Sequence, residues 1–267
     1  MSRRHRMARS ALIAWFTACS VSHLAAAAAG ADRWLDVRTF DSFVCYADFD
    51  LSDQARLLAD LPRLRRDVEV QLRLVSSEEA VELYLFHDRR HYRDFLASRF
   101  PGVTPRRAMF VKGRGRGMVF AYRHRELEVD LRHECTHAVL HASVSGLPLW
   151  LDEGLAEYFE VPPASRASGH PHLSSLVDTV TIPSEISHPA ELDDLQELAD
   201  LGLDQYRYSW AWVHYLLHGP PEAREELAEF LCDLKSGHAI EPLSRRLERR
   251  LPGLQVRLLG HLRASSD

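Results

Sequence analysis

One short stretch of this 267-residue chain constrains its fold more than any other, residues 130–160, DLRHECTHAVLHASVSGLPLWLDEGLAEYFE. His133 and His137 are four residues apart, so on a helix they lie on the same face, one turn from each other. The short turn SGLP then lets a second helix, which carries Glu153, fold back antiparallel to the first. The stretch therefore predicts two adjacent helices with polar side chains between them.

The residue types in these two helices are those of a catalytic metal site. Catalytic Zn²⁺ takes three protein ligands and one open position, and His133, His137 and Glu153 supply three such ligands. Glu134, beside the first histidine, is placed to take the proton of a water molecule as general base. Glu157 lies one turn beyond Glu153 and is expected to accept a hydrogen bond from the far nitrogen of a ligating histidine. We therefore predict a Zn²⁺ cofactor.

HECTH followed by WLDEGLAEYFE resembles the gluzincin metallopeptidases, the superfamily of thermolysin and the zinc aminopeptidases. It is more closely similar to an uncharacterised bacterial family with a peptidase-MA-like domain, which has H-E-x-T-H and W-L-x-E-G-x-A-E-Y helices and a later aromatic-serine helix. The resemblance is specific over residues 130–160, weaker over 205–219 and vague over 33–125. It implies a zinc metallopeptidase with the ligands, base and supporting carboxylate assigned above.

The later segment DQYRYSWAWVHYLLHG, residues 204–219, bears on the stabilisation of negative charge. Aminopeptidase relatives have a tyrosine near the start of a comparable helix that hydrogen-bonds the oxyanion of the tetrahedral intermediate. The resemblance places Tyr206 there, with Tyr208 as the alternative. Both can also be interpreted as half-buried helix aromatics. The resemblance further implies that the strand GMVFAYR, residues 117–123, is an edge strand that binds peptide backbone; an ordinary buried strand is the other interpretation.

Several neighbouring residues have less specific interpretations. His141 extends the histidine series by one more turn, but no glutamate base lies between it and the preceding histidine, which favours a packing role. Asp152 is expected to face solvent or cap a helix, and Glu160 is left open. The interval between His137 and Glu153 is a few residues shorter than in thermolysin, which weakens any transfer of substrate specificity.

The order of sequence patterns predicts an α+β fold. Alternating apolar segments come first and indicate hairpins within residues 33–47 and 108–123, whereas helical periodicity dominates from residue 127. We expect one gluzincin-like domain at 31–267, with a mixed α/β part at 31–126 and a mainly helical part at 127–267. The segment 161–190, rich in Pro, Ser and His, is predicted to be a long loop.

The amino-terminal segment predicts export. A basic start, an apolar run and an alanine-rich end describe a signal peptide over residues 1–30, so we expect a secreted or periplasmic protein with no later membrane-spanning helix. An uncleaved membrane anchor and lipid attachment at Cys19 are the alternatives. Without four signal arginines, the formal net charge of −5 becomes about −9, which argues against a nucleic-acid partner. A Cys45–Cys232 disulfide is left open.

These observations together predict a zinc-dependent metallohydrolase, a peptidase acting on proteins or peptides. The alternative is a catalytically silent peptidase-like module that binds envelope or extracellular proteins. No part of the sequence specifies a substrate preference or an oligomeric state.

Overall fold

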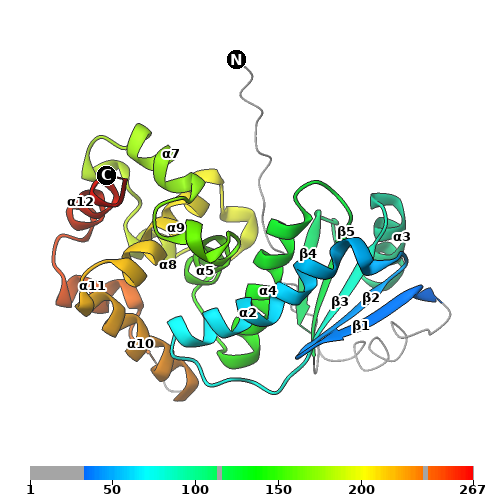
Figure 1. Cartoon of the computed structure of the whole chain (residues 1–267). Coiled ribbons are helices and arrows are strands. Elements are labelled where there is room, and N and C mark those ends of the chain that lie inside the picture. The colour runs from blue at the N-terminus through cyan, green and yellow to red at the C-terminus, as the bar shows by residue number, and fades with distance from the viewer. Residues whose placement is uncertain (1–32, 113–115, 237–239, 267) are drawn as a thin grey trace.

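The computed structural model describes residues 33–112, 116–236 and 240–266. The expected signal peptide, the possible lipid site at Cys19 and the tip of the second hairpin lie outside these described residues. Within them the α+β prediction is confirmed, because a sheet formed by the amino-terminal region is followed by a mainly helical carboxyl-terminal half (Figure 1). Among the described helices, none combines the length and the apolar character that a membrane crossing requires.

The sheet has five strands in the order β1-β2-β3-β5-β4. The strands are β1 Asp36–Phe40, β2 Phe43–Ala47, β3 Val81–Phe86, β4 Ala108–Lys112 and β5 Gly117–Tyr122. β1 pairs with β2 and β4 with β5 in the antiparallel direction, so both predicted hairpins form. β3 lies between β2 and β5 and is parallel to both.

Side-chain alternation along β3 separates two cores. Leu83 and Leu85 join the main hydrophobic cluster, whereas Tyr84 and Phe86 join a smaller aromatic cluster. Helices α2 (Ala55–Gln71) and α4 (Leu127–Ser143) pack against each other and contribute to the main cluster, and α3 (Arg89–Arg99) contributes to the aromatic one (Figure 1). A strand buried on both faces is typical of the centre of a parallel sheet.

The strand order decides between the two interpretations of residues 117–123 in favour of an ordinary buried strand. β5 lies between β3 and β4, so its backbone hydrogen-bonding groups are already paired on both sides. The strand is therefore an interior one, and it has no free side on which to bind an extended peptide. Among the described strands, β1 and β4 form the two edges of the sheet.

The helical half contains more structure than the sequence predicted. Its further helices are α5 Leu149–Phe159, α6 Pro163–Arg166, α7 Pro171–Thr179, α8 Pro189–Asp193, α9 Leu203–His218, α10 Pro221–Ser236, α11 Leu243–Arg250 and α12 Leu254–Ser266. The prediction of a long loop at 161–190 was wrong, because α6, α7 and the start of α8 lie there. Each of the three begins with a proline, which is favoured in the first turn of a helix, where no backbone N–H is needed.

The cysteines that the structure describes, Cys45, Cys135 and Cys232, are free. Cys45 is buried within the sheet core and Cys232 is exposed on α10, so the disulfide that the sequence left open does not form.

Gly154 allows α5 to approach α9 closely. A Cβ atom added at Gly154 would lie 2.5 Å from the backbone oxygen of Ser209 and 2.9 Å from the side chain of Val213. Because α5 also carries Glu153, this contact helps to fix the position of that carboxylate relative to α4 and α9.

Gly154→Ala is therefore expected to destabilise the protein by about 1–3 kcal/mol through overpacking. In a helix interior without such a close contact, replacing glycine by alanine stabilises the protein by about 1 kcal/mol, so the sign of the change in unfolding free energy is informative. Urea denaturation measures it. Gly260→Ala in α12 is the matched control, because nothing lies within 4 Å of its added Cβ, and it should leave stability unchanged or raise it. Equal gains in both variants would contradict the close approach of α5 and α9.

Candidate metal centre

α4 is buried on most of its surface because it contacts the sheet strands β4 and β5 as well as the helices α2 and α5. The polar side chains of the HECTH segment therefore lie inside the protein. A buried charged or polar group is costly unless it finds a partner, so the contacts of these side chains are informative about their role.

The structure brings His133, His137 and Glu153 together. The Nε2 atoms of the two histidines are 3.2 Å apart. Oxygens of the Glu153 carboxylate lie 3.5 Å from Nε2 of His133 and 3.8 Å from Nε2 of His137. Two ligands at zinc-bonding distance in a tetrahedral site are about 3.3 Å apart, so this triangle has the dimensions of a metal-binding trio.

The hydrogen bonding of Glu153 supports a cation at this point. The residue is fully buried, and within the described part of the chain neither carboxylate oxygen has a hydrogen-bond partner. Burial alone would lower the pKa of His133, but the carboxylates of Glu153 and Glu160 raise it well above its usual range. Burial alone would also lower the pKa of His137, but the carboxylates of Asp152 and Glu153 raise it above its usual value. The site thus has an excess of negative charge that a divalent cation would neutralise, and its residues fit the predicted metal.

Glu134 is buried at the same place on α4. Its Oε2 atom has no hydrogen-bond partner among the residues that the structure describes. Burial raises the pKa of its carboxyl group, although the adjacent His133 and His137 act in the opposite direction. A carboxylate in this environment binds a proton more readily than one in water, which suits a group that must accept and release one.

The far nitrogens of the two histidines contact carboxylates that the sequence did not assign. Nδ1 of His137 lies 3.0 Å from Asp152, whose second oxygen lies 2.8 Å from Nε2 of His141. Nδ1 of His133 lies 3.2 Å from Glu160. When each Nδ1–H donates to its carboxylate, the lone pair remains on Nε2, the nitrogen that faces Glu153. Asp152 and Glu160 therefore orient the two imidazoles.

Two expectations need correction here. Asp152 neither faces solvent nor caps a helix, because it is buried between His137 and His141. Burial opposes the effect of these two histidines, which nevertheless lower the pKa of Asp152. Glu157 is not the carboxylate at either far nitrogen, because Glu160 and Asp152 lie there. Its own carboxylate lies 2.8 Å from Nε2 of His172, and one donor atom of Glu157 is also within 4.8 Å of one of His133. Burial alone would raise the pKa of Glu157, but the contact with His172 lowers it to about 2.

The sequence contained a signal for one of the missed residues. Glu153, Glu157 and Glu160 are spaced at i, i+4 and i+7, which places all three on one face of α5 and its carboxyl-terminal end. No comparable spacing links His172 to this face, because it comes from α7, a helix that the sequence did not predict.

The two candidate tyrosines have different environments. Tyr206 lies in the first turn of α9 and is buried. Tyr208 is half-buried, and its hydroxyl group donates a hydrogen bond of 2.5 Å to the backbone oxygen of Glu185. This bond occupies the proton of Tyr208, which argues against Tyr208 as the donor to an oxyanion.

Comparison with known families and proteins is consistent with this site without naming an activity. Residues 129–240, from the start of α4 to the segment after α10, match a family model described as a protein of unknown function, DUF1570. The match covers less than half of the chain but includes every residue of the candidate site. A search of curated proteins found no match. Residues 129–240 are thus similar to the DUF1570 family, and their buried histidines and carboxylates could hold a metal ion.

Proposed function

We propose that this protein is a zinc-dependent peptidase of the gluzincin type. The observation that carries the proposal is the buried trio of His133, His137 and Glu153, in which a carboxylate with no hydrogen-bond partner among the described residues faces two imidazole nitrogens. Two imidazoles and one carboxylate are the ligand set of several catalytic zinc sites that hydrolyse peptides. An adjacent buried carboxylate, Glu134, supplies the proton acceptor that such a reaction needs.

The proposed chemistry assigns one task to each side chain. A zinc ion held by the trio would polarise the scissile carbonyl group and make a water molecule more acidic. Glu134 accepts the proton of the attacking water and passes it to the leaving amine. Tyr206 donates a hydrogen bond to the oxygen on which negative charge develops. With the ion bound, Asp152 and Glu160 would accept the Nδ1–H of His137 and His133, so that the lone pair of each Nε2 is directed to the metal.

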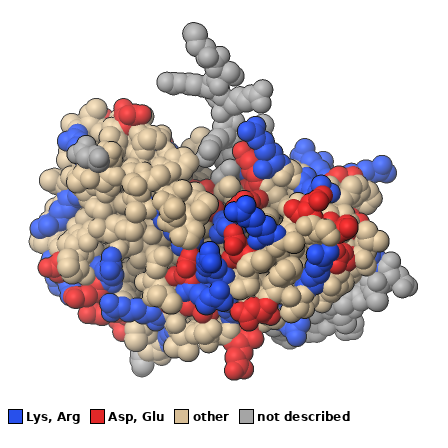
Figure 2. Space-filling view, viewed as in Figure 1, with Lys and Arg blue, Asp and Glu red and all other residues tan. Residues whose placement is uncertain are grey.

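The substrate class and the location are part of the proposal. A peptide or protein substrate is favoured by the ligand set and by the resemblance to gluzincins. Export across the membrane, to the periplasm or outside the cell, rests on the sequence pattern of residues 1–30. On the visible face, charges of both signs are interspersed (Figure 2).

Hydrolysis of casein and of a broad peptide library by the zinc-loaded protein tests the proposal, with Glu134→Gln as the reference. Hydrolysis above that reference supports a peptidase. Bound zinc without such hydrolysis would instead favour the silent binding module, and a protein that binds no metal after zinc reconstitution would contradict both.

The orienting carboxylates lead to a prediction about metal affinity. Asp152→Asn and Glu160→Gln are each expected to weaken zinc binding about 10–100-fold, the usual cost of losing such a partner. Glu157→Gln is the matched control, because its carboxylate contacts His172 instead of a predicted ligand, and it should have a smaller effect. Competition with a chromophoric chelator measures the three affinities. If Glu157→Gln weakened zinc binding more than the other two variants, Glu157 would be the carboxylate that supports a ligating histidine, as the sequence predicted.

A further inference from the structure

A second group of metal-binding side chains lies at the carboxyl ends of two parallel strands, β2 and β3. Asp48 directly follows β2, His87 directly follows β3, and His91 lies in the first turn of α3. Because β2 and β3 are parallel neighbours, their carboxyl ends meet at the same end of the sheet. One donor atom from each of the three side chains lies within 4.8 Å of the other two.

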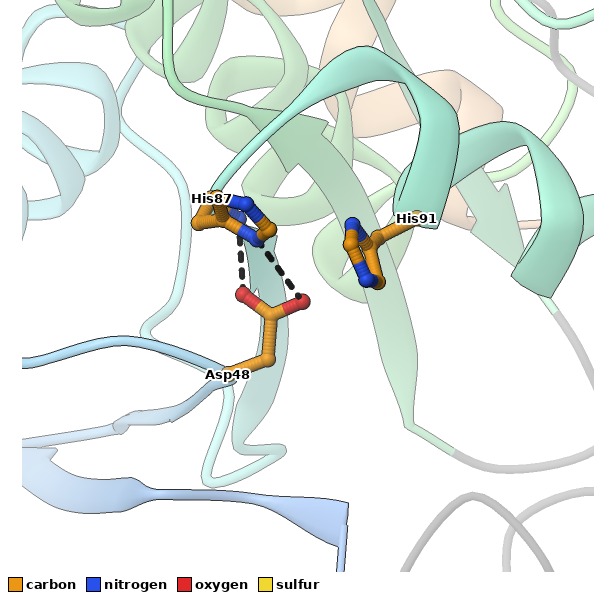
Figure 3. A group of neighbouring side chains, drawn as sticks. All are labelled: Asp48, His87 and His91. Atoms are coloured by element: carbon orange, nitrogen blue, oxygen red, sulfur yellow. Dashed lines mark hydrogen bonds and ion pairs between the residues drawn. The ribbon is translucent and has the colours of Figure 1, made fainter.

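The carboxylate of Asp48 is held in a defined orientation. Its Oδ1 accepts the backbone N–H of His87 at 2.7 Å, and its Oδ2 lies 3.8 Å from Nδ1 of the same residue. The ring centroids of His87 and His91 are 4.4 Å apart. Figure 3 shows the Asp48 carboxylate pointing toward the space between the two rings. Oδ2 and the two imidazoles are therefore the donors available at this point.

Asp88 contacts both imidazoles. Its Oδ1 accepts the backbone N–H of His91 at 2.9 Å and lies 3.0 Å from Nδ1 of that ring. Its Oδ2 lies 2.9 Å from Nε2 of His87. When Asp88 accepts these two ring N–H groups, the lone pairs remain on Nδ1 of His87 and Nε2 of His91. Metal-binding histidines characteristically donate their other N–H to a carboxylate in this way.

We propose that Asp48, His87 and His91 form a second Zn²⁺ site, independent of the buried centre, with water completing the coordination. Two imidazoles and one carboxylate suit zinc better than the hard ions Mg²⁺ and Ca²⁺, which prefer oxygen ligands alone. The side chains of His87 and His91 are 46% and 51% exposed, so an ion can enter and leave without opening the fold. The charges of Asp48 and Asp88 offset the positive end of the α3 dipole.

Counting bound zinc in the full chain tests this site. After equilibrium dialysis against Zn²⁺, the wild-type protein should hold about two ions per chain, one in each site. His91→Gln should hold one fewer, and so should Asp48→Asn, which keeps an acceptor for the backbone N–H of His87. His188→Gln is the matched control, because His188 is a partly exposed histidine beside a carboxylate outside this group. It should hold as many ions as the wild type.

The buried centre provides an internal comparison that separates the two proposals. Glu153→Gln should lose the buried ion and keep the surface one. If His91→Gln and Asp48→Asn bind as much zinc as the wild type, the surface site is refuted whatever happens at the buried centre. If the wild type holds a single ion that is lost in His91→Gln but kept in Glu153→Gln, the surface site stands and the buried zinc site falls. A wild-type protein without zinc refutes both sites.

Discussion

Glu134→Gln is expected to lower the rate of peptide hydrolysis about 10²–10⁴-fold, the usual contribution of a general acid–base group. The amide has nearly the same size as the carboxylate but cannot take a proton from water at neutral pH. The loss should appear in kcat more than in KM, because proton transfer belongs to the chemical step and not to substrate binding. Steady-state kinetics on the best library peptide measure both constants.

The zinc content of Glu134→Gln must be unchanged for this result to be informative, since Glu134 is not one of the proposed ligands. Glu128→Gln is the matched control on the same helix. Glu128 lies on the outer face of α4, where it pairs with Arg132, and its side chain is 55% exposed. That variant should keep wild-type kcat. A Glu134→Gln protein that keeps its zinc and more than a tenth of the wild-type rate would contradict the assignment of Glu134 as general base.

The parts of the site that depend on helix periodicity could be predicted from the sequence. The spacing within residues 130–160 predicted the two helices and the shared face of His133 and His137, and the resemblance to gluzincins assigned Glu153 to the same site, where the structure also brings it. The α+β fold class was equally accessible, because the strand patterns precede the helical ones along the chain.

The partners of these residues depended on tertiary structure that spacing does not encode. Asp152 reaches His137 because of the rotation of α5 about its own axis, which its packing on α4 and α9 determines. His172 reaches Glu157 from α7, a helix that the proline-rich composition concealed. Side-chain alternation likewise cannot tell an interior strand from an edge strand, so the sequence left both interpretations of residues 117–123 open, and only the strand order decided between them.

The group of Asp48, His87 and His91 also depends on tertiary structure that local spacing does not reveal. Asp48 and His87 are far apart in sequence, and only the parallel pairing of β2 with β3 brings them together. His87 and His91 are four residues apart, but the first of them precedes α3, so helix spacing alone did not suggest a site.

Removal of zinc is expected to destabilise the fold through the buried centre. A ligand present at 100 times its dissociation constant stabilises the native state by about 2.7 kcal/mol. For a chain of this size, each kcal/mol corresponds to a shift in Tm of about 2–4 °C, so a chelator should lower Tm by about 5–11 °C. The physical cause is the Glu153 carboxylate, which is fully buried and has no hydrogen-bond partner among the described residues. Without a cation it must be stabilised by protonated imidazoles alone.

Glu153→Gln should abolish this response, because the variant lacks one of the three ligands and no longer buries a carboxylate that depends on the two imidazoles for its charge balance. Calorimetry with and without chelator measures the difference, and the experiment is best made in the His91→Gln background, in which the surface site cannot contribute. Glu157→Gln, one turn along α5 from Glu153, is the matched control and should keep the chelator response. If the Tm of Glu153→Gln in the His91→Gln background still falls by about 5 °C or more on chelation, the Glu153 carboxylate is not the ligand that couples zinc binding to folding.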